Sequence, residues 1–408
     1  MKVFILTTSI IAAIKAVWTR ESPFAAATAL FPTNKEGKYI IESEGIRLAF
    51  TNNGGALTNL WIDDTNGNEL DIVMGFDFAD AYLKYPGNPF LNGVIGELVR
   101  KNPRKHVGDG ANSSWSISFT PGRYAGVISG GQFELDGLTP DSRQYEWEQG
   151  ITITFVLFDR GWNGFPGTAA ACLTHTVTPY EWRIAFGVTP TRKATPINLS
   201  QQVFWNLNGF AANSSMTVAE HRLHLPFSGL RLDMDAGGIP TGDLRANKRG
   251  SAYDFWAEGK QLGRGLAQLH DPEACQHSSA ASSCDRYDET FLVARPQPWK
   301  KEEYPVAILS SAYSGISVSL YTDQEALHVH TWDSEPEPVT VKQAQGTGTV
   351  PRFGAISMEM QDLADAINNP EWQRAGRTVW GMDRLYTAFS SFKFTVDEVK
   401  EGKGSWMN

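Results

Sequence analysis

Short segments in which apolar and polar residues alternate recur along this chain from Tyr39 onward, with turn residues between them. Alternation with a period of two puts successive side chains on opposite faces of a strand, so each segment fits a half-buried β-strand. Clear examples are residues 46–50 (IRLAF), 151–155 (ITITF), 182–186 (WRIAF) and 316–320 (ISVSL). Helical periodicity is scarce. The pattern predicts an all-β protein built as a large sandwich of antiparallel sheets.

The turns between these segments are rich in glycine and asparagine. Such residues adopt the positive φ angles that tight hairpins need. The best examples are residues 53–55 (NGG), 65–67 (TNG) and 236–238 (AGG).

The chain of 408 residues is long for one domain, but it has no short-period repeat and no Pro/Gly-rich linker that would divide it. We therefore expect one β-sandwich domain over residues 39–400. Residues 97–121 differ from their surroundings, since they show little alternation and contain four basic residues between positions 100 and 105. This segment is predicted to be a loop or an insertion.

The charge balance excludes one class of partner. The formal net charge is −9, and the chain lacks the dense Lys/Arg cluster of a nucleic-acid-binding protein, so we expect no nucleic-acid partner. The aromatic content is high, with 13 Trp, 12 Tyr and 22 Phe, which suits either a β-rich core or platforms on which a ligand ring stacks.

The N-terminus has the features of a secretory signal peptide. Lys2 precedes a mostly apolar run over residues 3–16, and residues 27–29 (ATA) match a cleavage site. We predict a signal peptide and N-terminal extension over residues 1–29, with an ordinary extension as the alternative. Lys15 interrupts the apolar run, which is also too short for a membrane span, so no membrane partner is expected.

Cysteine usage and glycosylation sequons also favour a secreted protein. Cys275 and Cys284 lie close enough in sequence to close a small disulfide loop, which leaves Cys172 as an unpaired and buried thiol. Residues 112–114 and 213–215 are N-glycosylation sequons. An oxidising, extracellular location accounts for all of these features.

Local motifs exclude several kinds of chemistry. The Gly-rich segments lack the Lys-Ser/Thr of a phosphate-binding loop, and there is no G-x-S-x-G nucleophile motif. His328 and His330 alternate along one predicted strand and so share a face, but nearby sequence offers no third ligand. We expect no metal site.

A series of motifs runs in order from about residue 50 to nearly the C-terminus. They are residues 53–60 (NGGALTNL), 72–76 (IVMGF), 93–96 (GVIG), 130–137 (GGQFELDG), 164–167 (GFPG), 196–199 (PINL), 239–242 (IPTG) and 358–361 (MEMQ). Together they resemble the motifs of the aldose 1-epimerase (galactose mutarotase) family, of which this chain looks like a divergent member. The resemblance implies a large β-sandwich (supersandwich) that binds a monosaccharide in an open cleft and uses no cofactor.

The resemblance also implies a reaction. Mutarotases interconvert the α and β anomers of a free hexose through acid/base opening of the sugar ring. The family's catalytic carboxylate corresponds to Glu359, and Gln361 two positions on lies on the same strand face. Asp288 corresponds to an aspartate that hydrogen-bonds sugar hydroxyls. We expect the protein to be a monomer.

Three departures from the family pattern lie around the expected sugar site. Gln202 stands where the family has its general-acid histidine, and an amide donates a hydrogen bond but cannot deliver a proton. Gly126 and Val127 replace an Asn-Arg pair, and the segment between Gly137 and Ile151 is too short for a loop that carries a second histidine.

These departures leave alternatives open. His330, on a strand predicted over residues 327–331, is the best candidate for a replacement histidine, whereas His175 is expected to be structural. The rival to an active epimerase is a non-catalytic, secreted carbohydrate-binding protein that has lost its general acid. An enzyme with a different substrate is a third possibility.

Overall fold

The computed structural model describes residues 33–85, 91–95, 141–147, 150–159, 165–211, 216–235, 238–269, 286–333 and 338–397. Several sequence-based predictions fall outside these residues: the signal peptide, the insertion at 97–121, the substitutions at 126 and 127, both sequons and the Cys275–Cys284 disulfide. The domain limits of 39–400 stay a prediction.

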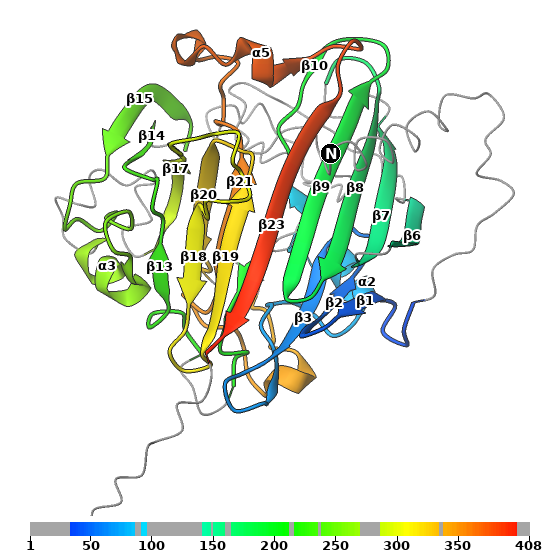
Figure 1. Ribbon diagram of the computed structural model, residues 1–408, viewed down its shortest axis with the longest axis vertical. Coiled ribbons are helices and arrows are strands. Elements are labelled where there is room, and N and C mark those ends of the chain that lie inside the picture. Colours follow the sequence, from blue (N-terminus) through cyan, green and yellow to red (C-terminus); the bar gives the residue numbers. More distant parts are fainter. Residues whose placement is uncertain are drawn as a thin grey trace, which may run out of the picture.

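The larger of two main sheets has nine antiparallel strands, and its long members β23, β9 and β8 dominate Figure 1. In spatial order the strands are β16 (Lys260–Gln261), β13 (Arg222–His224), β18 (Ala307–Ser310), β19 (Ile316–Thr322), β23 (Tyr386–Val396), β9 (Glu181–Pro190), β8 (Ala169–Thr178), β7 (Gly150–Asp159) and β6 (Asp141–Trp147).

The second main sheet has six strands and carries the candidate site. In spatial order they are β12 (Phe204–Trp205), β21 (Ile356–Gln361), β20 (Ala326–Thr331), β17 (Asp288–Leu292), β14 (Leu230–Met234) and β15 (Pro240–Ala246). All of its strand pairs are antiparallel. The all-β antiparallel architecture predicted from the alternation is confirmed.

Smaller elements complete the described chain. A four-stranded sheet consists of β1 (Tyr39–Ser43), β2 (Ile46–Phe50), β3 (Leu57–Asp63) and β4 (Glu69–Asp71), and two short pairs join β5 (Val94–Ile95) to β11 (Ser200–Gln201) and β10 (Thr195–Pro196) to β22 (Val379–Trp380). The helices are α2 (Ala79–Lys84), α3 (Leu262–Leu269), α5 (Ala375–Thr378) and two 3-10 turns, η2 (Gln343–Gln345) and η3 (Pro370–Trp372). No helix in the described part of the chain is long and apolar enough to cross a membrane.

The core lies between the two main sheets. Leu327 and Val329 of β20 and Met358 of β21 belong to the same buried cluster as Val318 of β19 and Phe392 of β23. Burying an apolar side chain of this size typically contributes about 1.5–3 kcal/mol, so this layer holds the sheets together. Because strand residues alternate, the neighbours of these core residues point to the outer face of the six-stranded sheet.

The sequence-predicted strands agree with the structure. Residues 46–50 form β2 in full, and the other three examples lie within β7, β9 and β19. The predicted turns also hold where they are described: Gly54, Gly55 and Gly67 have φ of +61°, +57° and +78°. At Gly55 a side chain would collide with Leu173, since an added Cβ would lie 2.5 Å from its methyl group.

His175 and Cys172 are buried in the nine-stranded sheet. The His175 ring stacks on Phe50 with ring centroids 4.3 Å apart, and its Nδ1 accepts a hydrogen bond from Trp182 Nε1 at 3.3 Å. Burial lowers the pKa of His175 to about 3, so it is a neutral core residue, as expected. The Cys172 thiol is free and buried and contacts the carbonyl oxygen of Gly187 at 3.6 Å.

Candidate active site

Glu359 lies in the middle of β21 with its side chain on the outer face of the sheet. It is buried, and its Oε1 accepts two hydrogen bonds, from Gln202 Nε2 at 2.9 Å and from Ser357 Oγ at 2.7 Å. Both bonds end on the same oxygen, and among the described residues no hydrogen bond reaches Oε2. One oxygen of this carboxylate is therefore held in place by two donors from the protein.

Gln202 reaches Glu359 from the neighbouring chain segment. It lies between the short strands β11 and β12, and its backbone N–H donates to the Gly93 carbonyl at 3.0 Å. Pairing of Phe204 with Ser357 then fixes β12 beside β21. Gln202, which the motif resemblance matches to a histidine, is thus a donor to the carboxylate of Glu359.

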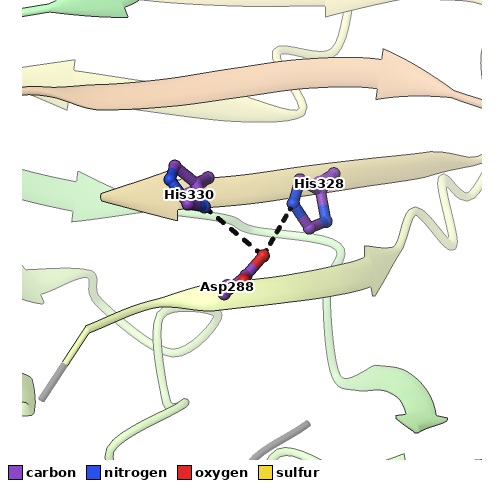
Figure 2. Close-up of side chains that lie close together, drawn as sticks. All are labelled: Asp288, His328 and His330. Carbon is purple, nitrogen blue, oxygen red and sulfur yellow. Dashed lines mark ion pairs between the residues drawn. The ribbon is translucent and has the colours of Figure 1, made fainter. Parts of the chain in front are cut away.

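Asp288 begins β17, two strands away from β21. Its Oδ1 lies 3.1 Å from His328 Nε2 and 3.4 Å from His330 Nδ1, and Figure 2 shows both rings reaching from one strand toward this oxygen. Its Oδ2 lies 3.4 Å from the guanidinium of Arg286, which also pairs with Asp333. Burial alone would raise the pKa of Asp288, but the two histidines outweigh it and hold this pKa well below the usual range.

His328 lies between the two carboxylates. In the register of β20 and β21 it is directly opposite Glu359, and its Nδ1 is 3.0 Å from the hydroxyl of Thr290 on β17. Burial opposes its protonation, but the hydrogen bond with Asp288 and the charges of Glu359, Asp288 and Glu289 outweigh burial and raise the pKa of His328 above 6.5.

The remaining predicted residues share the same face. His330 pairs with Asp288 on one side and with Ser357 on the other, and it lies edge-on to the ring of Phe204. Gln361 is buried on β21, two positions beyond Glu359, opposite Ala326. The structure therefore brings Glu359, Gln202, Asp288, His330 and Gln361 onto one surface of one sheet.

Asp288, His328 and His330 also have the composition of a cation site, since their donor atoms lie within 4.8 Å of one another. Two observations favour a hydrogen-bonded cluster instead. The His328–Asp288 distance is that of a hydrogen bond, and Arg286 already places a positive charge beside Asp288.

Sequence reasoning missed four neighbours of the site: His328 as a partner of Asp288, together with Thr290, Arg286 and Ser357. Ser357 could have been found, because residues two apart on a strand share a face and Ser357 precedes Glu359 by two. The pairing of His328 with Asp288 depends on the register between strands 40 residues apart, which local patterns do not encode.

A small cavity of about 30 Å³ is lined by apolar residues and glycines. Its lining includes Phe155, Leu157, Cys172, Leu173 and Phe186. None of its lining residues carries a charge, so it offers no acid or base.

The fold and the site together define a β-sandwich protein with a cluster of carboxylate, histidine and amide side chains on the outer face of one sheet. The chain belongs to the aldose 1-epimerase family, whose sequence profile, described as "Aldose 1-epimerase", matches residues 138–379, more than half of the chain. The resemblance seen in the motifs is thereby confirmed, and the protein is a member of a family of sugar epimerases, which are isomerases.

Individual relatives agree with this assignment. The chain is 50% identical to "Epimerase FSL3" of Gibberella zeae over 97% of its own length and 93% of that protein. It is 25% identical to a "Probable aldose 1-epimerase" of Arthroderma benhamiae, over 82% of this chain and 80% of that protein. It is 24% identical to "Galactose mutarotase" of Homo sapiens, over 82% of this chain and 88% of that protein.

Solved structures support the fold. An aldose epimerase homologue from C. elegans superposes with a TM-score of 0.64 at 19% identity, over 88% of this chain and 99% of that one. A galactose 1-epimerase from Lactobacillus acidophilus gives a TM-score of 0.61 at 17% identity, over 90% of this chain and 97% of that one. The predicted mutarotase-like sandwich is confirmed.

Proposed function

We propose that this protein interconverts the α and β anomers of a free hexose, with Glu359 as the catalytic base. The observation that carries the proposal is the state of that carboxylate: Gln202 and Ser357 hold Oε1, while Oε2 accepts no hydrogen bond from the described residues. A base fixed in this way is positioned to take one proton from a bound ligand.

The protein has only to take up and donate protons while the sugar ring opens and closes. Oε2 of Glu359 takes the proton of the O1 hydroxyl, the O1–C1 bond becomes a carbonyl, and the C1–O5 bond breaks as O5 receives a proton. Rotation about C1–C2 exposes the other face of the carbonyl carbon. Closure then reverses each transfer and yields the other anomer, so the protein ends in its starting protonation state.

The neighbouring polar groups are proposed to hold the sugar. Asp288 is ionised beside His328, His330 and Arg286, and a carboxylate is an acceptor of hydrogen bonds from sugar hydroxyls. Gln361 and His330 share the face and complete the polar surface. The chemistry of these groups suits a ligand with several hydroxyls.

One observation favours a second candidate, a carbohydrate-binding protein without catalysis. Gln202 stands at the position of the family's histidine, and its amide cannot deliver a proton. If no other group supplies that proton, ring opening is slow and the site only binds sugar.

An anomerisation assay separates the two. Freshly dissolved α-D-galactose or α-D-glucose is followed by polarimetry or proton NMR with wild-type protein, Glu359→Gln and the control Glu303→Gln, which removes an exposed carboxylate that pairs with Lys300. The proposal expects acceleration by wild type and the control, and a loss of about 100-fold or more in Glu359→Gln. Saturable binding without acceleration by wild type would establish the binding protein instead.

The location and assembly of the protein belong to the same proposal. An apolar N-terminal run, two sequons and the Cys275–Cys284 pair support export of the chain. N-terminal sequencing of the secreted protein tests export and removal of the signal peptide. Light scattering tests whether the secreted protein is a monomer.

A further inference from the structure

We propose that His328 is the general acid of this protein, so that the proton donor has moved from the β11–β12 segment to strand β20. The inference rests on the proposed function. It goes further by assigning the proton that O5 must receive to a residue that neither the family pattern nor the sequence motifs indicate.

The cross-strand register places this donor. O1 and O5 of a pyranose are bonded to the same carbon, so the acid and the base must lie close together. His328 and Glu359 are directly opposite on β20 and β21, and side chains in such pairs have Cβ atoms about 4.5–5.5 Å apart. His330 is opposite Ser357 and therefore diagonal to Glu359, about 7–8 Å away by the same geometry. The register thus favours His328 over His330, which the sequence had suggested.

The two ring nitrogens of His328 have different partners. Asp288 Oδ1 lies 3.1 Å from Nε2, and a carboxylate keeps a proton on the nitrogen that it contacts. Nδ1 faces the Thr290 hydroxyl at 3.0 Å, which can accept from a protonated Nδ1 and donate to a neutral one. The pair therefore resembles an aspartate–imidazole dyad, in which the carboxylate orients the ring and the distal nitrogen exchanges the proton.

The surrounding charges favour the protonated ring. Asp288 and Glu289 on β17 and Glu359 on β21 are acidic, while Arg286 pairs with Asp288 and Asp333, and Arg231 pairs with Glu289. His330 shares the oxygen of Asp288. The net effect raises the pKa of His328 above its usual value, which favours the form that can donate a proton.

The proton balance is complete within the site. As the C1–O5 bond breaks, its electron pair goes to O5, which takes the proton from Nδ1 of His328. The products are the open-chain aldehyde, protonated Glu359 and a neutral His328 whose Nε2–H stays bonded to Asp288. On closure Nδ1 recovers the proton from the O5 hydroxyl, and Glu359 returns its proton to O1.

The test is a rescue experiment. His328→Gln is expected to lower kcat by about 100-fold or more, and the double variant Gln202→His/His328→Gln to recover at least about 10-fold of that loss by placing a histidine beside Glu359 from the other side. His224→Gln, on β13 in the other sheet, is the matched control and should match wild type. The decline of kcat/KM at alkaline pH in the wild type should be absent in His328→Gln.

The outcomes separate the two proposals. If the wild type accelerates anomerisation and His328→Gln does so equally, the acid is not His328, although the proposed function stands. If the wild type shows no acceleration, the proposed function itself fails. A loss of wild-type activity in EDTA that Zn²⁺ restores would also overturn the inference, because these side chains would then act on a cation. Recovery in the double variant excludes misfolding as the cause of the loss.

Discussion

Gln202 donates its side-chain amide to the same oxygen of Glu359 that the hydroxyl of Ser357 binds, at 2.9 Å and 2.7 Å. One donor comes from the segment before β12 and the other from β21 itself. Together they hold this oxygen of Glu359 in one position and so orient the carboxylate. The glutamine is therefore expected to assist the base.

Replacing Gln202 by leucine should leave the Glu359 carboxylate less well positioned. A hydrogen bond to a charged group is worth about 1.5–3 kcal/mol, so kcat/KM should fall by about 10-fold or more. Ser357→Ala removes the other donor to the same oxygen and should lower kcat/KM in the same direction. Wild-type kcat/KM in both variants would show that neither donor positions the base.

Replacing Asp288 by asparagine should change both binding and proton donation. The amide removes a charge that raises the pKa of His328, so the alkaline limb of kcat/KM should move to lower pH, and KM should rise as a hydroxyl contact weakens. We expect a loss of about 100-fold in kcat/KM. The control Asp333→Asn frees Arg286 but keeps Asp288, and it should cost less. Equal losses in the two variants would point to Arg286 rather than to the aspartate.

Two buried histidines outside the site should make the fold sensitive to acid. Burial lowers the pKa of His175 and of His221 to about 3, against about 6.5 in the unfolded chain. Between these two pH values the histidines of the unfolded chain bind protons, whereas the buried histidines of the native state stay neutral. The contribution of each neutral histidine to the free energy of unfolding is therefore complete above pH 6.5 and is lost as the pH drops. Each histidine should account for about 2 kcal/mol between pH 7 and pH 5.

Urea unfolding at the two pH values measures this effect. The variant His175→Phe loses the acceptor for Trp182, which costs stability at both pH values, but its loss between pH 7 and pH 5 should be smaller than that of the wild type by about 2 kcal/mol. His224→Gln should keep the wild-type slope. A His175→Phe slope equal to that of the wild type would contradict the buried-neutral state of His175.

Thiol counting tests the cysteine assignments. Burial raises the pKa of Cys172 to about 12, so this thiol should not react with a disulfide reagent such as DTNB in the native protein at pH 8. Secreted protein unfolded in guanidinium without reductant should show one reactive thiol per chain, because Cys275 and Cys284 are predicted to be bonded. Three thiols would refute the disulfide, and a native reactive thiol would refute the burial of Cys172.

The sequence predicts the sheets better than it predicts the site. Alternation along residues 46–50 is a local property, and it identifies β2 because each strand must bury one face whatever its partners are. The site depends on which strands are neighbours. Nearby sequence offers no third polar residue to join His328 and His330. Asp288 joins them only because β17 pairs with β20 in a register that tertiary packing sets.

The resemblance located Glu359 and Asp288 but gave no reason for Gln202. Its hydrogen bond to Glu359 becomes visible only when the short strand β12 is seen to pair with β21, more than 150 residues later in the chain.

The alternation along β20 and β21 separates two sets of side chains. Leu327, Val329 and Met358 pack between the sheets, whereas His328 and Glu359 lie on the opposite face of the same strands. A substitution at position 328 or 359 therefore changes the polar face without removing an apolar side chain from the core. A scaffold of this kind lets one face of a sheet vary in sequence while the architecture stays constant.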